Sequence, residues 1–265
     1  MTTKTLHVVL YVAAALLVLL VTIAVIAPAQ WAAGALRSAS GGRVDLADAR
    51  GTLWNGSAIL VLASGDEPGA ARASLPERLS WTLSPWALLA AQVDLTLVHP
   101  SALTQPLRIQ APLLGGGNTS LGATTVRLPA SLLVGLGAPW NTLRPGGILT
   151  LSWDRLAFAP RRMEGTNLTA EWQYASSALT PVSPMGHYRL NTNGVWPGTQ
   201  LELLTISGPL ELKGNGTIPE GGRLRFTGRA QALPGTDPGV RAQLTGLISL
   251  IGRRDGDGAL LNFGG

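Results

Sequence analysis

Few residues in this sequence have the type and spacing that catalysis requires. Outside the apolar N-terminal segment the histidines are His99 and His187, and no HExxH pair or other helical spacing brings two histidines together. The sequence also lacks the GxSxG elbow that exposes a nucleophilic serine and the GxxxxGK[ST] loop that binds phosphate. The sequence therefore predicts that the protein is not an enzyme.

Metal and cofactor chemistry has equally little support. The chain contains no cysteine, which excludes disulfides, zinc–thiolate sites, CxxC redox motifs and cysteine nucleophiles. The DxDG string at 255–258 lacks the downstream acidic ligand that a calcium-binding EF-hand loop needs. We therefore predict no metal and no cofactor, and binding is the chemistry that remains.

Tryptophan and arginine are the residue types here best suited to binding another protein. The chain has eight tryptophans against three phenylalanines and three tyrosines. Trp54, Trp140 and Trp196 lie close to Gly56, Pro139 and Pro197, where a turn leaves a side chain partly exposed. With a local group of arginines they make up the candidate partner-binding residues: Trp54, Trp140, Trp196, Arg223, Arg225 and Arg229.

The net charge of +5 and the pI of about 10.4 raise the question of nucleic-acid binding. Phosphate recognition needs clustered cations, whereas most basic residues here are single and interleaved with acidic ones. A solvated surface explains this pattern, and we predict no nucleic-acid partner.

The body of the chain is predicted to be antiparallel β structure. With 265 residues and 46% apolar content, the chain can bury one sizeable core. Its 33 glycines and 18 prolines occur in short clusters, as is typical of turns between short strands. Apolar and polar residues alternate at 79–84, 93–97, 149–154, 168–174, 210–213 and 224–226. Such alternation is typical of strands with one dry and one wet face. It places Trp81, Trp153, Trp172 and Tyr174 on the dry face.

Turns and two short helices complete this prediction. The dipeptides at 146–147, 193–194, 215–216 and 221–222 contain glycines that can supply a positive φ in tight connections. One helix is expected at 129–136, between Pro129 and Gly137. The other is expected at 237–251, with Asp237 as its cap. Its apolar stripe consists of Leu244, Leu247, Ile248 and Ile251.

The N-terminal segment 6–27 is apolar and carries no formal charge. A helix of that length, at about 1.5 Å per residue, crosses a hydrocarbon layer of about 30 Å. We predict a short cytoplasmic head at 1–5, a transmembrane helix at 6–27, a linker at 28–42 and a periplasmic β-rich domain at 43–265. The alternative is a secretory signal cleaved after Ala29; both interpretations export everything after Gln30.

The predicted fold class is therefore mainly β. It consists of one N-terminal transmembrane helix followed by an elongated, twisted antiparallel β-sheet domain with one or two short packed helices. Because no long Pro/Ser linker divides the exported part, we predict a single domain there.

The order of short motifs resembles the type II secretion system protein N family, also called general secretion pathway protein N. After the apolar segment come GTLWNG at 51–56, LSW at 79–81, SPWALL at 84–89, EW at 171–172, GHY at 186–188 and GPL at 208–210. The resemblance implies structural roles, with glycine for turns, tryptophan for core volume and proline for edges or turns. The residues concerned are Gly51, Trp54, Gly56, Trp81, Pro85, Trp86, Gly208 and Pro209.

The resemblance also implies a function without catalytic residues. Such a protein is a single-pass inner-membrane accessory subunit whose periplasmic part binds platform subunits and/or the outer-membrane secretin. We expect it to offer a free sheet edge or an aromatic rim to a neighbouring domain. The short head and alanine-rich linker of this chain differ from the usual appearance of the family.

Two other functions stay open at the level of sequence. The first is an envelope lipid-binding or lipid-handling protein with an apolar groove on a curved sheet, which bound acyl chains would support. The second is a periplasmic hydrolase released by cleavage after Ala29, which would need a carboxylate or serine site in a cleft.

Overall fold

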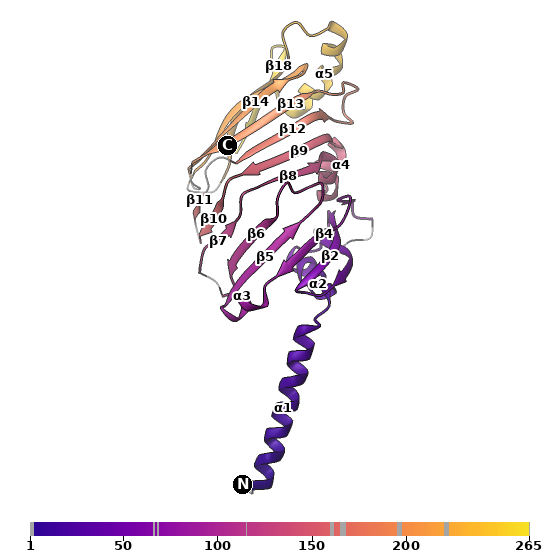
Figure 1. Ribbon diagram of the computed structural model, residues 1–265. Helices are drawn as coiled ribbons and strands as arrows, with labels where there is room; N and C mark the ends of the chain where they lie inside the picture. Colours follow the sequence, from indigo (N-terminus) through magenta and orange to yellow (C-terminus); the bar gives the residue numbers. More distant parts are fainter. Residues whose placement is uncertain are drawn as a thin grey trace.

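The computed structural model describes residues 3–65, 67, 69–114, 116–159, 162–164, 168–194, 198–219 and 223–264. It shows an elongated β body with helix α1 projecting from one end (Figure 1). In the described residues the body consists of two nine-stranded sheets, and every strand pairing is antiparallel. The prediction of a mainly antiparallel β protein is confirmed, but the structure has two sheets where one was expected.

Each sheet is built mostly from strands that follow one another in the chain. The first sheet contains β1 (Val44–Gly51), β2 (Asn55–Ala63), β3 (Arg72–Ser74), β4 (Leu79–Leu83), β5 (Gln92–Val98), β6 (Leu107–Pro112), β7 (Thr119–Leu121), β10 (Leu156–Ala159) and β11 (Arg162–Glu164). The second sheet contains β8 (Thr124–Pro129), β9 (Gly146–Trp153), β12 (Thr169–Ser176), β13 (Gly186–Asn193), β14 (Thr199–Ser207), β15 (Leu210–Ile218), β16 (Arg225–Ala232), β17 (Arg253–Asp255) and β18 (Gly258–Phe263).

The chain crosses between the two sheets more than once. It leaves the first sheet after β7, forms β8 and β9 in the second, and returns to the first for β10 and β11. An isolated bridge joins Leu103, just before β6, to Val126 of β8. The two sheets are therefore joined where they meet, by this bridge and by the connections that pass between them.

Short helices lie around the sheets. They are α1 (Thr3–Val25), α2 (Ala29–Ala39), α3 (Pro85–Leu89), η1 (Ala130–Leu136), α4 (Trp140–Leu143) and α5 (Pro238–Ile251). Within the part of the chain that the structure describes, no helix is both long and apolar enough to cross a membrane.

The segment that was predicted to be a linker contains helix α2. Its first residue, Ala29, is fully buried and packs with Leu46, Ala58 and Trp81 of the first sheet. The alanines that made this segment look like a spacer are small side chains that let the helix approach the sheet closely. A helix therefore covers one end of the dry face.

The predicted C-terminal helix is confirmed in α5. The Asp237 carboxylate caps it by accepting hydrogen bonds from the backbone N–H groups of Gly239 at 2.8 Å and Val240 at 3.3 Å. The predicted stripe is buried against the second sheet through Leu244, Leu247 and Ile248. The other predicted helix forms as a 3₁₀ helix, η1, which begins at Ala130, directly after Pro129.

Tyr174 does not occupy the dry face that the alternation predicted for it. The pairing of β12 shifts between Trp172 and Ala175, and Tyr174 has a φ of +52°. This β-bulge breaks the period-two pattern and leaves Tyr174 70% exposed.

The dipeptide Asn215–Gly216 is not a turn. It lies inside β15, where Asn215 pairs with Thr227 and Gly216 with Phe226 of β16. Gly216 faces the Phe226 ring, so the glycine accommodates an aromatic side chain where a hairpin was expected. The dipeptide at 193–194 does begin a connection, since Gly194 follows β13 with a φ of +100°, and the one at 221–222 lies outside the described residues.

Substitution of Gly56 by alanine is expected to destabilise the body by about 1–3 kcal/mol, because it overpacks the core. A Cβ at Gly56 would collide with the Trp81 ring and would lie 2.7 Å from the Thr52 carbonyl oxygen. Urea unfolding of the protein measures the effect, with Gly246→Ala on α5 as the control, because a Cβ there meets nothing within 4 Å. Equal losses in both variants would contradict the packing of Trp81 on Gly56.

Candidate functional site

The two faces of the sheets differ sharply in polarity. On the dry face, the described positions from β2 to β16 hold no charged side chain; typical cross-strand neighbours there are Trp81 with Leu97 and Trp172 with Tyr188. The predicted dry-face tryptophans satisfy their indole N–H groups locally: Trp81 donates to the Leu53 carbonyl at 3.0 Å and Trp172 to that of Gly146 at 2.8 Å. The dry face therefore presents hydrocarbon.

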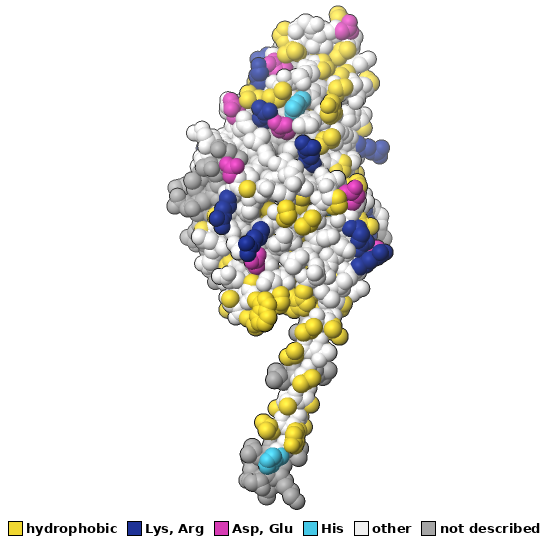
Figure 2. Space-filling model, viewed as in Figure 1, with side chains coloured by type: hydrophobic (Ala, Val, Ile, Leu, Met, Phe, Trp, Pro, Cys, Tyr) yellow, Lys and Arg dark blue, Asp and Glu magenta, His cyan; other side chains and the backbone are white. Residues whose placement is uncertain are grey.

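The wet face carries the charged residues, mostly as ion pairs. Figure 2 shows the side of the body on which polar surface predominates and basic and acidic side chains are scattered. In the first sheet the Arg108 guanidinium binds Asp94, which holds the pKa of that carboxyl below its ordinary value. In the second sheet Arg229 pairs with Asp255 at 3.1 Å.

Glu171 lies at the centre of the most connected group on the wet face. Its carboxylate accepts hydrogen bonds from Gln173 Nε2 at 3.0 Å and Arg189 Nε at 2.8 Å, and His187 Nε2 lies 3.4 Å away. The bond from Gln173, followed by the one from Arg189, lowers the pKa of Glu171 below its ordinary value. Glu171 is therefore an ionised carboxylate whose charge is balanced by Arg189.

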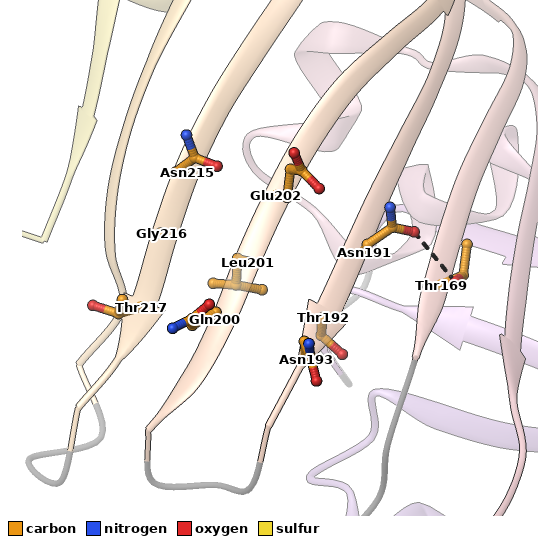
Figure 3. A pocket seen from close by; sticks show the side chains of 10 residues that line it. All are labelled: Thr169, Asn191, Thr192, Asn193, Gln200, Leu201, Glu202, Asn215, Gly216 and Thr217. Carbon is orange, nitrogen blue, oxygen red and sulfur yellow. Dashed lines mark hydrogen bonds between the residues drawn. The ribbon is translucent and has the colours of Figure 1, made fainter.

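A polar hollow of about 660 Å³ lies close to one end of the strands of the second sheet (Figure 3). Four strands supply one cross-strand row of polar side chains, Thr169, Asn191, Glu202 and Asn215. A second row, nearer the strand ends, consists of Asn193, Gln200 and Thr217. In Figure 3 the Asn191, Glu202 and Asn215 side chains stand side by side along the first row, and Thr169 Oγ1 lies 3.3 Å from Asn191 Oδ1.

The side chains of the hollow are suited to hydrogen bonding. Amides, hydroxyls and one carboxylate provide both hydrogen-bond donors and acceptors. None of its lining residues is a histidine, lysine or cysteine that could act as a base or nucleophile. Nor do three or more His, Asp or Glu side chains gather in a metal-binding group anywhere in the described residues. Such an arrangement suits a partner with many polar groups, such as an extended polypeptide.

An apolar hollow of about 280 Å³ lies on the dry face of the same sheet. The side chains that form it belong to neighbouring strands and are only partly buried: Leu149, Leu151, Ala170, Trp172, Leu190 and Leu203. Helix α5 covers the adjoining part of this face, and α2 covers a part of the first sheet. The part of the dry face that contains the hollow is therefore covered by neither α2 nor α5.

An apolar rim lies at the end of the body from which α1 projects (Figures 1 and 2). It consists of Trp86 and Leu89 of α3, which are 77% and 81% exposed, and of Leu113 and Leu114, which are 53% and 74% exposed. The Leu113 N–H donates to the Ala91 carbonyl at 2.8 Å, which holds the two segments together. The core role implied for Trp86 is therefore wrong, because the five-residue helix α3 carries this side chain beyond the sheet.

The structure does not bring the predicted partner-binding residues together. Trp54 is half-buried between β1 and β2, and Trp140 is half-buried at the start of α4. Trp196 lies outside the described residues. The arginines Arg223, Arg225 and Arg229 are exposed at or on β16, far along the second sheet.

The remaining motif residues occupy structural positions. Gly51 ends β1, and Pro85 is the first residue of α3 after the Ser84 cap. Gly208 has a φ of +118°, a conformation that favours glycine, and the Pro209 carbonyl accepts the Leu233 N–H at 2.8 Å.

The prediction from sequence missed the apolar rim and the polar rows. The paired leucines at 88–89 and 113–114 are a signal for the rim, because consecutive apolar residues do not fit a period of two. The rows carry no local signal, since only the strand register aligns their members.

Comparison with known proteins identifies the family. Neither the curated proteins nor the solved structures contain a match to this chain. A family model described as "Type II secretion system (T2SS), protein N" matches residues 42–261, which include both sheets and α5. The family predicted from the order of motifs is thus confirmed, and the chain belongs to the type II secretion system protein N family.

Proposed function

We propose that this protein is a non-enzymatic, single-pass inner-membrane accessory subunit of the type II secretion system. Its β body extends into the periplasm and binds platform subunits and/or the outer-membrane secretin. The observation that carries the proposal is the family match over 42–261, which places the β body among components of this machine. The polar hollow, whose side chains supply hydrogen-bond donors and acceptors, supports a binding role for the body.

The apolar surface of α1 and its surroundings supports attachment to the membrane. Residues 6–27 carry no formal charge, and Leu10, Leu16, Val18 and Val25 of α1 are each more than half exposed. The apolar rim lies beside the exit of α1, where Trp86 can insert at the interface between lipid and water. An anchor concentrates the body in the plane of the membrane, so that weak contacts with other subunits suffice.

The wet face of the second sheet is the partner-binding surface that we favour. Strand addition at a sheet edge has less support, because β17 has three residues, two of them arginines, and β1 contains a bulge at 47–50. The polar hollow lies on this open face, and its amides and hydroxyls can hydrogen-bond to a partner. Contacts through Trp54, Trp140, Trp196 and the arginines of 223–229 remain part of this proposal.

Site-specific crosslinking in living cells tests this function. A photoreactive amino acid replaces Asn191, Glu202 or Thr217 of the polar hollow, and exposed Leu250 on α5 serves as the control position. We expect adducts with another secretion subunit at the hollow and none at the control. The proposed partner surface is wrong if both sites give the same products, and the proposed function is wrong if no position yields a secretion subunit.

A further inference from the structure

The uncovered part of the dry face is the surface that the proposed function leaves unexplained. Helix α5 packs on Tyr188, Leu210 and Ala259, and α2 packs on the first sheet. Between these helices the apolar hollow leaves Leu149, Leu151, Leu190 and Leu203 partly exposed, although they belong to the dry face. A concave surface lined by apolar side chains suits an apolar ligand.

The lining of the hollow offers no hydrogen bond to a ligand. The Trp172 indole already donates to the Gly146 carbonyl at 2.8 Å, and the Tyr188 hydroxyl donates to that of Leu210 at 3.0 Å. Thr150 and Glu171 also border the hollow. They are opposite each other in the register of β9 and β12, and their side chains lie on the wet face. The part of a ligand that lies in the hollow must therefore be hydrocarbon without polar groups.

A polypeptide fits this surface poorly. An extended peptide would bury N–H and C=O groups against carbon with no partner, which is costly. A helix satisfies its own backbone, but at a diameter of about 10 Å it can lay only one face on this open hollow. An unbranched acyl chain is narrower and has no polar groups along its length, so all of its surface can lie against the carbon lining.

An apolar route, traced through neighbouring strand positions, leads from the apolar rim toward the hollow. From Leu113 in the rim it follows the dry face of β6 through Ala111, Ile109 and Leu107 to Leu103, which precedes the strand. Leu103 bridges to Val126 of β8, and Val126 pairs with Leu151 in the hollow.

We propose that the apolar hollow binds an acyl chain of a membrane phospholipid that enters along this route. The proposal rests on the membrane attachment proposed above, because a bilayer beside the rim is the source of the lipid. The headgroup stays outside the carbon-lined surface, so the site selects for the chain rather than for the headgroup.

Photolabelling of the isolated protein tests the site. The full chain is reconstituted in phosphatidylcholine nanodiscs that contain phosphatidylcholine with a diazirine in its acyl chain, and labelled peptides are mapped by mass spectrometry. We expect label on β9, β12 and β13 of the wild type. Ala170→Phe fills the hollow and should reduce that label at least severalfold. Ser152→Phe, next to Leu151 but on the opposite face of the sheet, should leave the label unchanged.

A second variant keeps the test decisive if Ala170→Phe fails to fold. Leu151→Ser adds a polar group to the hollow without adding volume and should also reduce the label. Label confined to α1 and the rim, or equal label in wild type and both folded variants, would overturn the proposal. Because this assay contains no other secretion subunit, its failure is separate from a failure of the crosslinking experiment.

Discussion

Replacement of Leu244 by alanine is expected to lower the free energy of unfolding by about 2–5 kcal/mol. Leu244 is completely buried where α5 packs on the second sheet, beside Leu247 and Ile248. Its removal loses the transfer energy of the side chain and leaves a cavity. Urea denaturation of the protein, followed by tryptophan fluorescence, measures the loss.

The same helix provides the control. Leu250 is 69% exposed, so Leu250→Ala should change the free energy of unfolding by no more than about 0.5 kcal/mol. A small effect of Leu244→Ala would mean that α5 is not packed against the sheet as described. The dry face would then be open over a wider area.

Arginine at both Leu16 and Val18 is expected to abolish stable attachment of the protein to the membrane. Both positions lie near the middle of the segment 6–27, where each arginine costs about 2.5–3.5 kcal/mol on insertion. Carbonate extraction of cell membranes measures the result: the wild type should remain in the pellet, and the double variant should be lost from it.

Apolar exchanges at the same positions, Leu16→Ile and Val18→Leu, should leave the protein in the pellet. Retention of the arginine variant would show that the body is held by other contacts, such as the apolar rim. Determination of the N-terminus of the wild type separates an anchor from a cleaved signal, because cleavage after Ala29 would leave Gln30 as the first residue.

The strands could be predicted from the sequence because each sheet buries one face, and the alternation therefore records the burial directly. The cap of α5 was also predictable, since Asp237 followed by proline is a local signal. The bulge at Tyr174 and the position of Gly216 depend on the partner strand, which a single segment does not reveal. The alanine-rich helix α2 was missed because its stability comes from contact with the sheet.

The candidate surfaces were less accessible to sequence reasoning than the strands. The polar row exists only because register aligns Asn191, Glu202 and Asn215 across neighbouring strands. The apolar hollow exists because the dry face of the strands is larger than the area that the helices cover. A prediction of either surface needs the full topology and not merely the pattern within each strand.

The repeated crossing between the sheets has a consequence for shortened versions of the protein. The first sheet is completed by β10, which pairs with β7, yet β8 and β9 of the second sheet lie between these strands in the chain. No truncation that ends before Leu156 contains a finished first sheet, since β7 then keeps an open edge with unsatisfied backbone groups. Completion of the first sheet thus depends on strands that follow part of the second, so fragments that end earlier should aggregate through the open edge of β7.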